Sequence, residues 1–313
     1  MSTSKACVFH GIDIGGSKIE LVSFEDQNGT LLERHRRRVA TPRHDFDEFI
    51  QAVAALVAEA DAVLAQRAVV GIGLPGIVDT QSGRQLSSNV PALNGRLVQH
   101  SLGERLKRPV LIGNDCQCFA LSEAHGGAAD ALPSMFGAIL GTGAGGGFCV
   151  GGELVAGRNG AAGEWGHWAL PATLRNKYSL PLVPCPCGQS ACLERYVSGS
   201  GMTFLHRHLC GEERAAIEIA ARAAAGNEPA LRTLEIHLEL LAHAMAGLVM
   251  AYDPHAIVLG GGLSSLPHLY QQLPAAMARH LFQGLHLPPI LPPRFGDAGG
   301  ARGAALLARQ RYV

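Results

Sequence analysis

Residues 111–124 read LIGNDCQCFALSEA, and this stretch contains the junction around which the chain is organised. The apolar run Val110–Ile112 predicts a buried strand, and the apolar spacing from Cys116 to Ala120 predicts a helix directly after it. Asn114 and Asp115 lie between the two, where both residue types cap helices well. Strand ends in open α/β sheets are also where ligands bind. Asp115 is therefore either a capping carboxylate or a general base, depending on what surrounds it.

Strands and helices follow a repeated order on the two sides of this junction. Before it, strands are predicted over 6–14, 19–24, 31–39 and 69–74, and helices over 45–64 and 102–106. After it, strands are predicted over 136–140, 148–150, 154–156 and 255–259, and helices over 212–226, 228–252 and 300–311. Each half opens with a strand, a glycine loop and a returning strand, although the residues differ. The sequence therefore predicts an α/β fold with two domains of similar topology.

The overall charge argues against nucleic acid as a partner. In 313 residues, 26 Lys and Arg balance 26 Asp and Glu, so the chain has no excess of positive charge. Its one basic block, Arg34–Arg38, is interpreted as a solvated strand. The N-terminal residues lack a secretory signal pattern, and the apolar segment Leu240–Tyr252 is too short for a membrane span and contains His243. We expect a cytoplasmic protein with no nucleic-acid or membrane partner.

Three glycine-rich loops follow predicted strands, at 15–16, 141–147 and 260–262. Glycine lets the backbone approach a phosphate closely, and exposed N–H groups can then bind the anion. A structural turn would explain any one loop, whereas three favour a nucleotide. The GxGxxG match at 71–76 is interrupted by Pro75, and Gly11–Lys18 misses the P-loop spacing by one residue. The remaining option is a strand-to-strand glycine loop, as in actin-like and hexokinase-like ATPases with two duplicated domains.

A cysteine cluster together with one histidine predicts a metal site. Cys185, Cys187 and Cys192 lie within eight residues, and His167 lies 18 positions upstream of the first cysteine. Three cysteines and one histidine are a usual ligand set for structural zinc, and buried free thiols are the alternative. Because four protein ligands close the coordination sphere, zinc would shape a loop here rather than perform chemistry.

Two acids flank this cluster. Glu164 and Glu194 are either ordinary surface acids or carboxylates that bind vicinal sugar hydroxyls, and a loop fixed by metal would hold such carboxylates still. Cys116 and Cys118 lie on the predicted helix beside Asp115 and are interpreted as packing thiols.

The order of these motifs resembles that of the ROK (repressor, ORF, kinase) sugar kinases over nearly the whole chain. The motifs that carry the resemblance are DIGGSK at 13–18, ND at 114–115, GTG at 141–143, GEWGH at 163–167, the cysteine motif at 185–194 and GGG at 260–262. Within the family, segments 89–92, 118–124 and 297–300 resemble members that act on N-acetylglucosamine. Segments 93–95 and 162–167 resemble members that act on fructose or mannose.

The resemblance implies an actin-like (ribonuclease-H-like), duplicated two-domain sugar-kinase fold with a zinc-knuckle loop. Residues 1–116 plus 298–313 would form a smaller N-terminal lobe, and residues 117–297 a larger lobe that contains the zinc loop. The active site would lie in the cleft between the lobes. The resemblance also implies a homodimer whose substrates are a sugar and ATP.

The activity implied is ATP-dependent phosphorylation of the 6-hydroxyl of N-acetyl-D-glucosamine, with Asp115 as the base. The sugar would be held by Asn89, Asn114, Asp115, Glu164, His167 and Glu194. Structural Zn²⁺ would be held by His167, Cys185, Cys187 and Cys192, and Mg²⁺ would lie near Asp13. ATP would be bound by Gly11, Ile12, Asp13, Ile14, Gly15, Gly16, Ser17, Lys18, Gly141, Thr142, Gly143, Ala144, Gly145, Gly146, Gly147, Phe148, Gly260, Gly261 and Gly262.

Three positions depart from the family's usual residues. Ser17 stands where the family usually has Thr, Gln117 where it has Asn, and Ala191 where it has Gly, which would strain the knuckle if the backbone there is left-handed. Two alternatives to this kinase remain within the family's range. One is a hexokinase acting on fructose, mannose or glucose. The other is a non-catalytic sugar-binding regulator, although a repressor would need a helix-turn-helix before Gly11 and the chain leaves no room for one.

Overall fold

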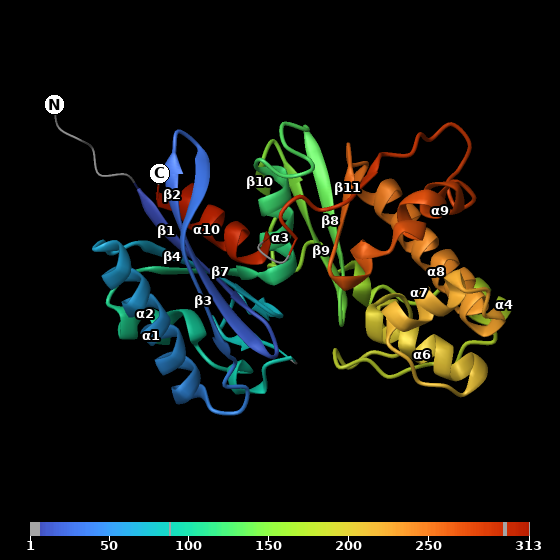
Figure 1. Ribbon diagram of the computed structural model, residues 1–313, viewed down its shortest axis with the longest axis horizontal. Coiled ribbons are helices and arrows are strands. Elements are labelled where there is room, and N and C mark those ends of the chain that lie inside the picture. The colour runs from blue at the N-terminus through green and yellow to red at the C-terminus, as the bar shows by residue number, and fades with distance from the viewer. Residues whose placement is uncertain (1–6, 88, 297–298, 313) are drawn as a thin grey trace.

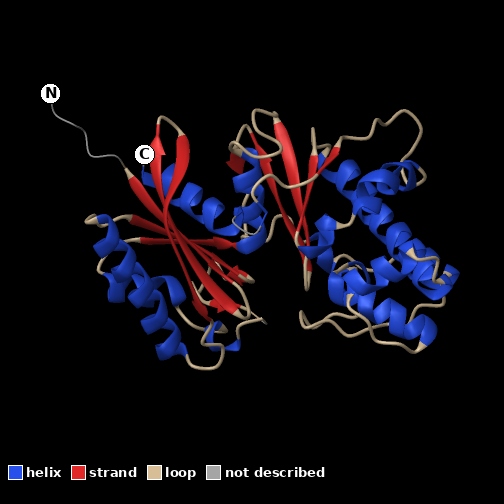
Figure 2. Cartoon of the chain, viewed as in Figure 1, coloured by secondary structure: helices blue, strands red, loops and turns tan. Residues whose placement is uncertain are grey.

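The computed structural model describes residues 7–87, 89–296 and 299–312, and it contains two five-stranded sheets. Helices α3 (Asp115–Ala124) and α10 (Gly299–Tyr312) lie between the two sheets, and the remaining longer helices lie on their outer sides (Figures 1 and 2). Each sheet begins with an antiparallel hairpin and continues with parallel strands. The predicted repeat of organisation is therefore present in the structure.

The first sheet has the strand order β3-β2-β1-β4-β7. Its strands are β1 (Val8–Ile14), β2 (Lys18–Gln27), β3 (Thr30–Ala40), β4 (Val69–Leu74) and β7 (Val110–Asn114). The hairpin between β2 and β3 turns at Asn28 and Gly29, whose φ angles are 54° and 91°. Positive φ at both central residues is what a tight type I′ hairpin turn requires.

Helices α1 (Phe46–Leu64) and α2 (Val98–Leu106) cover one face of this sheet (Figure 1). Asp45 is the N-cap of α1, and its side chain accepts a hydrogen bond of 2.9 Å from the backbone of Glu48. The helix predicted over 45–64 is confirmed as α1, and its buried apolar residues share a core with residues of β1 such as Ile12. The neighbouring Gly11 faces α10 on the opposite side, because side chains alternate between the faces of a strand.

The basic run Arg34–Arg38 lies on the edge strand β3 and is neutralised by acids of the same region. The buried Glu20 of β2 accepts hydrogen bonds from two of these arginines at 2.8 and 2.5 Å. Other members of the run pair with Glu25 and Glu59 at 2.6 and 3.6 Å. These pairs agree with the interpretation of the run as a solvated strand.

The second sheet has the order β10-β9-β8-β11-β12. Its strands are β8 (Ser134–Leu140), β9 (Ala144–Val150), β10 (Glu153–Leu154), β11 (Ile257–Gly260) and β12 (Ile290–Leu291). The predicted glycine loop 141–147 is too long, because the turn is confined to 141–143 and β9 begins at Ala144. Gly147 is a strand residue that makes room for α3, since a Cβ there would lie 2.8 Å from the Cα of Gln117.

The second half also contains most of the helices. They are α4 (Ala172–Lys177), α5 (Glu194–Val197), α6 (Gly199–Cys210), α7 (Ala216–Ala224), α8 (Glu228–Tyr252) and α9 (Pro267–Ala278). The predicted helix 228–252 is confirmed as α8, whereas α7 is shorter than the predicted 212–226 and α6 and α9 were not predicted. By length and composition α8 could cross a membrane, but 56% of its most apolar stretch is buried inside the fold.

Short elements complete the fold. They are the two-residue strands β5 (Ile77–Val78) and β6 (Gln85–Leu86), and the 3₁₀ turns η1 (Pro91–Leu93), η2 (Trp165–His167) and η3 (Gly262–Ser265).

Helices α3 and α10 join the two halves through a shared core. Phe9 of β1, Phe119 of α3, Met135 of β8 and Ala305 of α10 belong to one buried cluster that spans both sheets. The two helices touch at Gly303, where a Cβ would collide with the backbone carbonyl of Cys118 in α3. The predicted lobe boundary at 116/117 therefore falls inside α3, and the predicted boundary at 297/298 lies outside the described residues. The division into those lobes stays a prediction.

Candidate functional site

The carboxyl ends of three parallel strands meet at one edge of the first sheet. Asp13 of β1 pairs with Gly73 of β4, and Gly73 pairs with Gly113 of β7. Asp13 and the Asn114–Asp115 junction therefore lie at the same edge, although about a hundred residues separate them in the sequence. This is the edge at which open α/β sheets bind ligands.

Asn114, not Asp115, is the N-cap of α3. The side-chain oxygen of Asn114 accepts hydrogen bonds from the backbone N–H groups of Cys116 and Gln117 at 2.9 and 3.2 Å. Its side-chain nitrogen donates to the carbonyl of Gly76 at 2.9 Å, which joins α3 to the turn after β4. The Asp115 carboxylate accepts a hydrogen bond of 3.0 Å from the backbone N–H of Cys116. The capping role therefore belongs to its neighbour, and the Asp115 carboxylate keeps acceptor capacity for a ligand.

The surroundings of Asp115 raise its pKa to about 7. The largest cause is burial, which disfavours the charged carboxylate, and the nearby carboxylates of Asp13 and Glu164 raise the pKa further. Burial and the proximity of Glu194 also raise the pKa of Glu164, although His167 opposes that shift. Four acids from both halves of the molecule therefore act on one another here. A carboxyl group with a pKa near 7 is suited to accept a proton at neutral pH.

The first glycine turn lies beside this edge, between β1 and β2. The backbone N–H of Gly15 donates to the carbonyl of Lys18 at 2.9 Å, and the Thr41 hydroxyl donates to the carbonyl of Gly15 at 2.8 Å. A Cβ on Gly16 would lie 3.5 Å from the carbonyl oxygen of Asn89, so this exposed candidate for sugar binding lies beside the turn. Ser17 is exposed at the tip, and Ile12 and Ile14 are buried in the core.

Two of the other residues predicted to bind ATP, Gly11 and Asp13, lie against helix α10. Gly11 is a packing glycine, because a Cβ there would collide with the carbonyl of Ala301. The Asp13 carboxylate lies over the first turn of α10, where a Cβ on Gly300 would come within 2.6 Å of its Cγ. The positive end of the α10 dipole stabilises a carboxylate in that position.

The second and third glycine loops lie side by side at the end of the second sheet, because β8 and β11 are parallel neighbours. Gly261 has a φ of 76°, and a Cβ there would lie 2.7 Å from the backbone nitrogen of Gly141. The N-terminus of α6 supports the same turn, since the backbone N–H of Gly199 donates to the carbonyl of Gly141 at 2.7 Å and the Ser200 hydroxyl donates to the carbonyl of Thr142. The sequence analysis missed Ser200, although the run of small residues SGSG at 198–201 was a visible signal.

The remaining glycines of the predicted second loop have packing roles. A Cβ on Gly145 would lie 2.9 Å from the sulfur of Cys116, and one on Gly146 would lie 2.6 Å from the carbonyl of Gly137. Phe148 packs against the core of the second half. Within the predicted loop 141–147, the turn at 141–143 is therefore the part that can bend around an anion.

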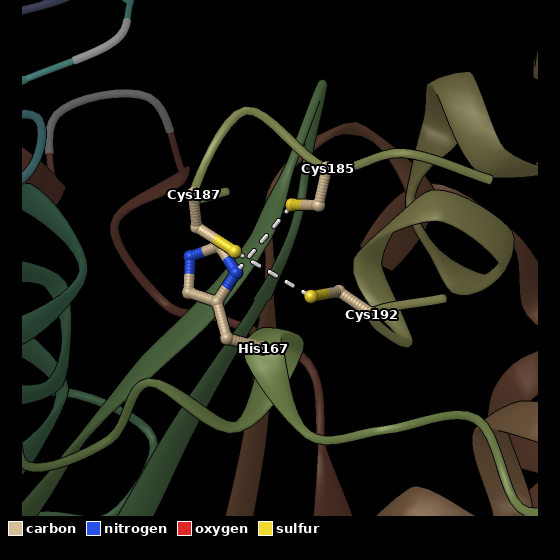
Figure 3. A group of neighbouring side chains, drawn as sticks. All are labelled: His167, Cys185, Cys187 and Cys192. Atoms are coloured by element: carbon tan, nitrogen blue, oxygen red, sulfur yellow. Dashed lines mark hydrogen bonds between the residues drawn. The ribbon is translucent and has the colours of Figure 1, made fainter. Parts of the chain in front are cut away.

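The predicted metal ligands are gathered in one place (Figure 3). The ligand atoms of His167, Cys185, Cys187 and Cys192 all lie within 4.8 Å of one another. The sulfur of Cys185 is 3.7 Å from Nδ1 of His167, and the sulfurs of the other two cysteines are 3.6 Å apart. Tetrahedral zinc requires about 3.6 Å between sulfur and nitrogen and about 3.8 Å between two sulfurs, from its usual bond lengths. The four residues fit a closed zinc site.

Both flanking acids connect this cluster to the glycine turn and the strand edge. Oε2 of Glu164 lies 3.6 Å from Nε2 of His167, the ring nitrogen that faces away from Cys185. Glu194, the first residue of α5, places Oε1 4.0 Å from the Cys185 sulfur, and its Oε2 accepts a hydrogen bond of 2.9 Å from the backbone of Ala144. A metal bound here would therefore hold both carboxylates in place.

Two of the three departures from the family's usual residues have a visible consequence. Ala191 has a φ of 60°, so the left-handed backbone that favours glycine is present beside Cys192. Gln117 is buried, and its side-chain nitrogen donates to the carbonyls of Gly160 and Ala162 at 3.1 and 3.0 Å.

Comparison with known proteins supplies an independent test of the motif pattern. The sequence profile of the ROK family matches residues 9–311. The chain is 43% identical to the N-acetylgalactosamine kinase AgaK of Shewanella sp. (strain ANA-3), covering 96% of both chains. It is 42% identical to the N-acetyl-D-glucosamine kinase of Pectobacterium atrosepticum, covering 96% of this chain and 98% of that one. The crystal structure of a ROK hexokinase from Thermus thermophilus superposes with a TM-score of 0.85 at 30% identity, covering 97% and 98%. The predicted actin-like two-domain fold is thereby confirmed.

Proposed function

We propose that this chain, which belongs to the ROK family, is an ATP-dependent sugar kinase that phosphorylates the 6-hydroxyl of N-acetyl-D-glucosamine. The products are N-acetylglucosamine 6-phosphate and ADP. ATP and Mg²⁺ are the cofactors of this reaction, and a structural Zn²⁺ is compatible with the cysteine–histidine cluster. The observation that carries the proposal is the Asp115 carboxyl, which has a pKa of about 7 and no capping role.

In the proposed reaction Asp115 removes the proton from the 6-hydroxyl as the sugar oxygen attacks the γ-phosphorus. The bond between that phosphorus and its bridging oxygen breaks, and ADP leaves with the electron pair. Asp13 would lie near Mg²⁺, and the ion, when bound, would supply positive charge that offsets the charge on the transferring phosphoryl group. Asn89, Asn114, Glu164, His167 and Glu194 hold the other groups of the sugar.

We assign the phosphate contacts to the turns at 15–17 and 141–143, and the adenosine side to 260–262. Gly15, Gly16 and Gly141 lie in turns, whereas Gly11 and Gly147 are packed against helices. This difference in surroundings supports the turns as the parts that bind anions.

A second acceptor sugar is favoured by one specific observation. The relative with 43% identity is an N-acetylgalactosamine kinase, and it covers as much of this chain as the N-acetyl-D-glucosamine kinases do. The two sugars differ only in the orientation of the 4-hydroxyl. The acceptor preference therefore depends on the residues around that hydroxyl and not on the phosphoryl-transfer machinery.

The acceptor is tested by measuring ADP release from ATP and Mg²⁺ with N-acetylglucosamine, N-acetylgalactosamine, glucose, mannose and fructose. We expect the highest kcat/KM for N-acetylglucosamine. A lead for N-acetylgalactosamine or a plain hexose would replace the proposed sugar and keep the kinase chemistry. No turnover with any of the five sugars would reject the kinase and favour a sugar-binding regulator.

We further propose that the protein is a cytoplasmic homodimer that acts without a nucleic-acid or membrane partner. The balance of charges on the chain supports the absence of nucleic acid. Light scattering would test the dimer, which has twice the chain mass of 32.9 kDa, and a single-chain mass at working concentrations would reject it.

A further inference from the structure

We propose that Gln117 is a positioning residue that sets the geometry of the acceptor site. Its side chain ties the first turn of α3, which carries Asp115, to the segment 157–163 that leads into Glu164. The inference rests on the proposed function, because it assigns Asp115 to the base and Glu164 to the sugar.

Gln117 is held both at its backbone and at the end of its side chain. Its backbone N–H is held by the Asn114 side chain at 3.2 Å, and α3 packs closely against Gly147 of β9. Its amide nitrogen then spans 43 and 45 residues of sequence to reach the carbonyls of Gly160 and Ala162. The residue is 5% exposed, so water does not compete freely for these two hydrogen bonds.

The segment that Gln117 holds has mostly local backbone contacts. The N–H of Gly160 donates to the carbonyl of Gly157 at 3.4 Å, and that of Ala162 donates to the carbonyl of Ala156 at 3.2 Å. Gly157 and Gly160 have φ angles of 76° and 69°, so the segment turns at residues that are free to adopt other conformations. A link from a rigid helix therefore restricts a segment that would otherwise have several conformations.

Glu164 directly follows the segment 157–163 that Gln117 holds. Gly163 has a φ of 105° and lies so close to Gly146 that a Cβ would collide with its carbonyl. The segment is thus held by Gln117 before Gly163 and by β9 at Gly163. Asp115 and Gln117 both lie in the first turn of α3, so this one turn positions the base and also holds the segment that leads into Glu164.

The test compares Gln117→Leu and Gln117→Asn with the wild-type enzyme. Leucine keeps the volume but removes both donors, and asparagine keeps the amide but shortens its reach by one methylene. Because small misplacements of a bound reactant are costly, we expect kcat/KM for the amino sugar to fall about 10-fold to 100-fold in Gln117→Leu. Most of the loss should appear in the KM for sugar, with the KM for MgATP unchanged. Gln117→Asn should give a smaller loss in the same direction and an altered ratio between N-acetylglucosamine and N-acetylgalactosamine.

Gln99→Leu is the matched control. The Gln99 side chain also donates to a backbone carbonyl, that of Val110 at 2.9 Å, but at the opposite end of β7 from Asp115. This variant should leave both KM values unchanged. Calorimetric titration of the amino sugar into each protein without ATP gives a second readout, in which weaker binding is expected for the Gln117 variants only.

The outcomes separate the two proposals. If the wild-type enzyme phosphorylates the amino sugar, and Gln117→Leu and Gln117→Asn keep its sugar KM, sugar affinity and acceptor ratio, the positioning role is rejected. An equal rise in the KM for sugar and for MgATP would also reject it, because that result indicates a merely structural residue. If the wild-type enzyme phosphorylates none of the sugars, the proposed function itself fails.

Discussion

Asp115 is the first residue of a helix, where acids commonly serve as caps. Its neighbours in the structure show that it does not have this capping role. The local sequence left both a capping carboxylate and a general base open, with the cap as the more ordinary interpretation. In the structure Asn114 is the cap, and burial of Asp115, together with the nearby carboxylates of Asp13 and Glu164, raises its pKa to about 7. That distinction could not be predicted, because it depends on Asp13 and Glu164, which approach from distant parts of the chain.

The first prediction at this scale concerns the protonation of Asp115. Its folded pKa lies above the ordinary value, so the carboxyl is protonated and cannot act as a base at low pH. We expect kcat/KM to rise with pH and to level off above about 7, following the ionised fraction. A profile from pH 5 to 9, measured with N-acetylglucosamine and saturating MgATP, checks this expectation.

Asp115→Asn complements that profile. The variant cannot accept the proton, so kcat should fall by about 10² to 10⁴ while sugar affinity changes little. Asp79→Asn is the control, since Asp79 is a half-buried acid whose side chain accepts hydrogen bonds from Gln81 and Ser82 in the turn before β6. Activity that is flat from pH 5 to 9 together with an active Asp115→Asn variant would remove Asp115 from the role of base.

At the scale of elements, the zinc loop was predictable and several helices were not. The three cysteines are close in sequence, so local spacing was sufficient to predict the cluster with His167. Helices α1 and α8 were predicted because their apolar residues recur with helical spacing. Helix α6 begins with Gly-Ser-Gly and α9 contains Pro274, and both features are typical of turns.

The second glycine loop was predicted too long for a related reason. A glycine that binds an anion and a glycine that admits a helix have the same local pattern. Gly145 and Gly147 belong to the second kind, which becomes visible only when α3 is placed on β9. The role of Gln117 could not be predicted from its local sequence either, because its hydrogen-bond partners Gly160 and Ala162 lie 43 and 45 residues away.

The prediction at this scale is that Cys187→Ser disrupts the zinc loop. Wild-type protein should contain about one zinc per chain by elemental analysis, and the variant should contain much less. Without the metal, Glu194 loses its fixed neighbour and the turn at 141–143 loses support through Ala144. We therefore expect a lower Tm and a reduced kcat in the variant.

The matched control is Cys7→Ser, which changes an exposed thiol outside the cluster and should alter none of these values. Wild-type protein that is fully active and contains no zinc would show that the four residues are free thiols. A Cys187→Ser variant with full zinc content would also contradict the assignment of Cys187 as a ligand.

At the scale of the whole molecule, the two sheets are joined by the close contact of α3 and α10. This contact was not predictable from the sequence, because α10 comes from the end of the chain and packs against β1 from its beginning. Gly303 allows the two helices to approach closely, and Gly11 of β1 and Gly71 of β4 allow α10 to lie against the first sheet. A Cβ at any of these three positions would collide with the backbone of the neighbouring element. The base on α3 and the Asp13 carboxylate are therefore positioned by the same interface.

The contact between α3 and α10 predicts that replacing a helical glycine by alanine lowers the stability at Gly303 and raises it at Gly103. In Gly303→Ala the new methyl group meets the carbonyl of Cys118, and backbone on both sides cannot move aside, so we expect a loss of about 1–3 kcal/mol of unfolding free energy. In Gly103→Ala the nearest heavy atom to the new Cβ is the Arg108 carbonyl oxygen at 3.7 Å, and alanine favours the helix, so we expect a gain of about 0.5–1 kcal/mol. Thermal unfolding of both variants should move Tm in opposite directions. A Gly303→Ala variant as stable as the wild-type protein would mean that α3 and α10 can separate without cost, and the two sheets would then not be held as one unit.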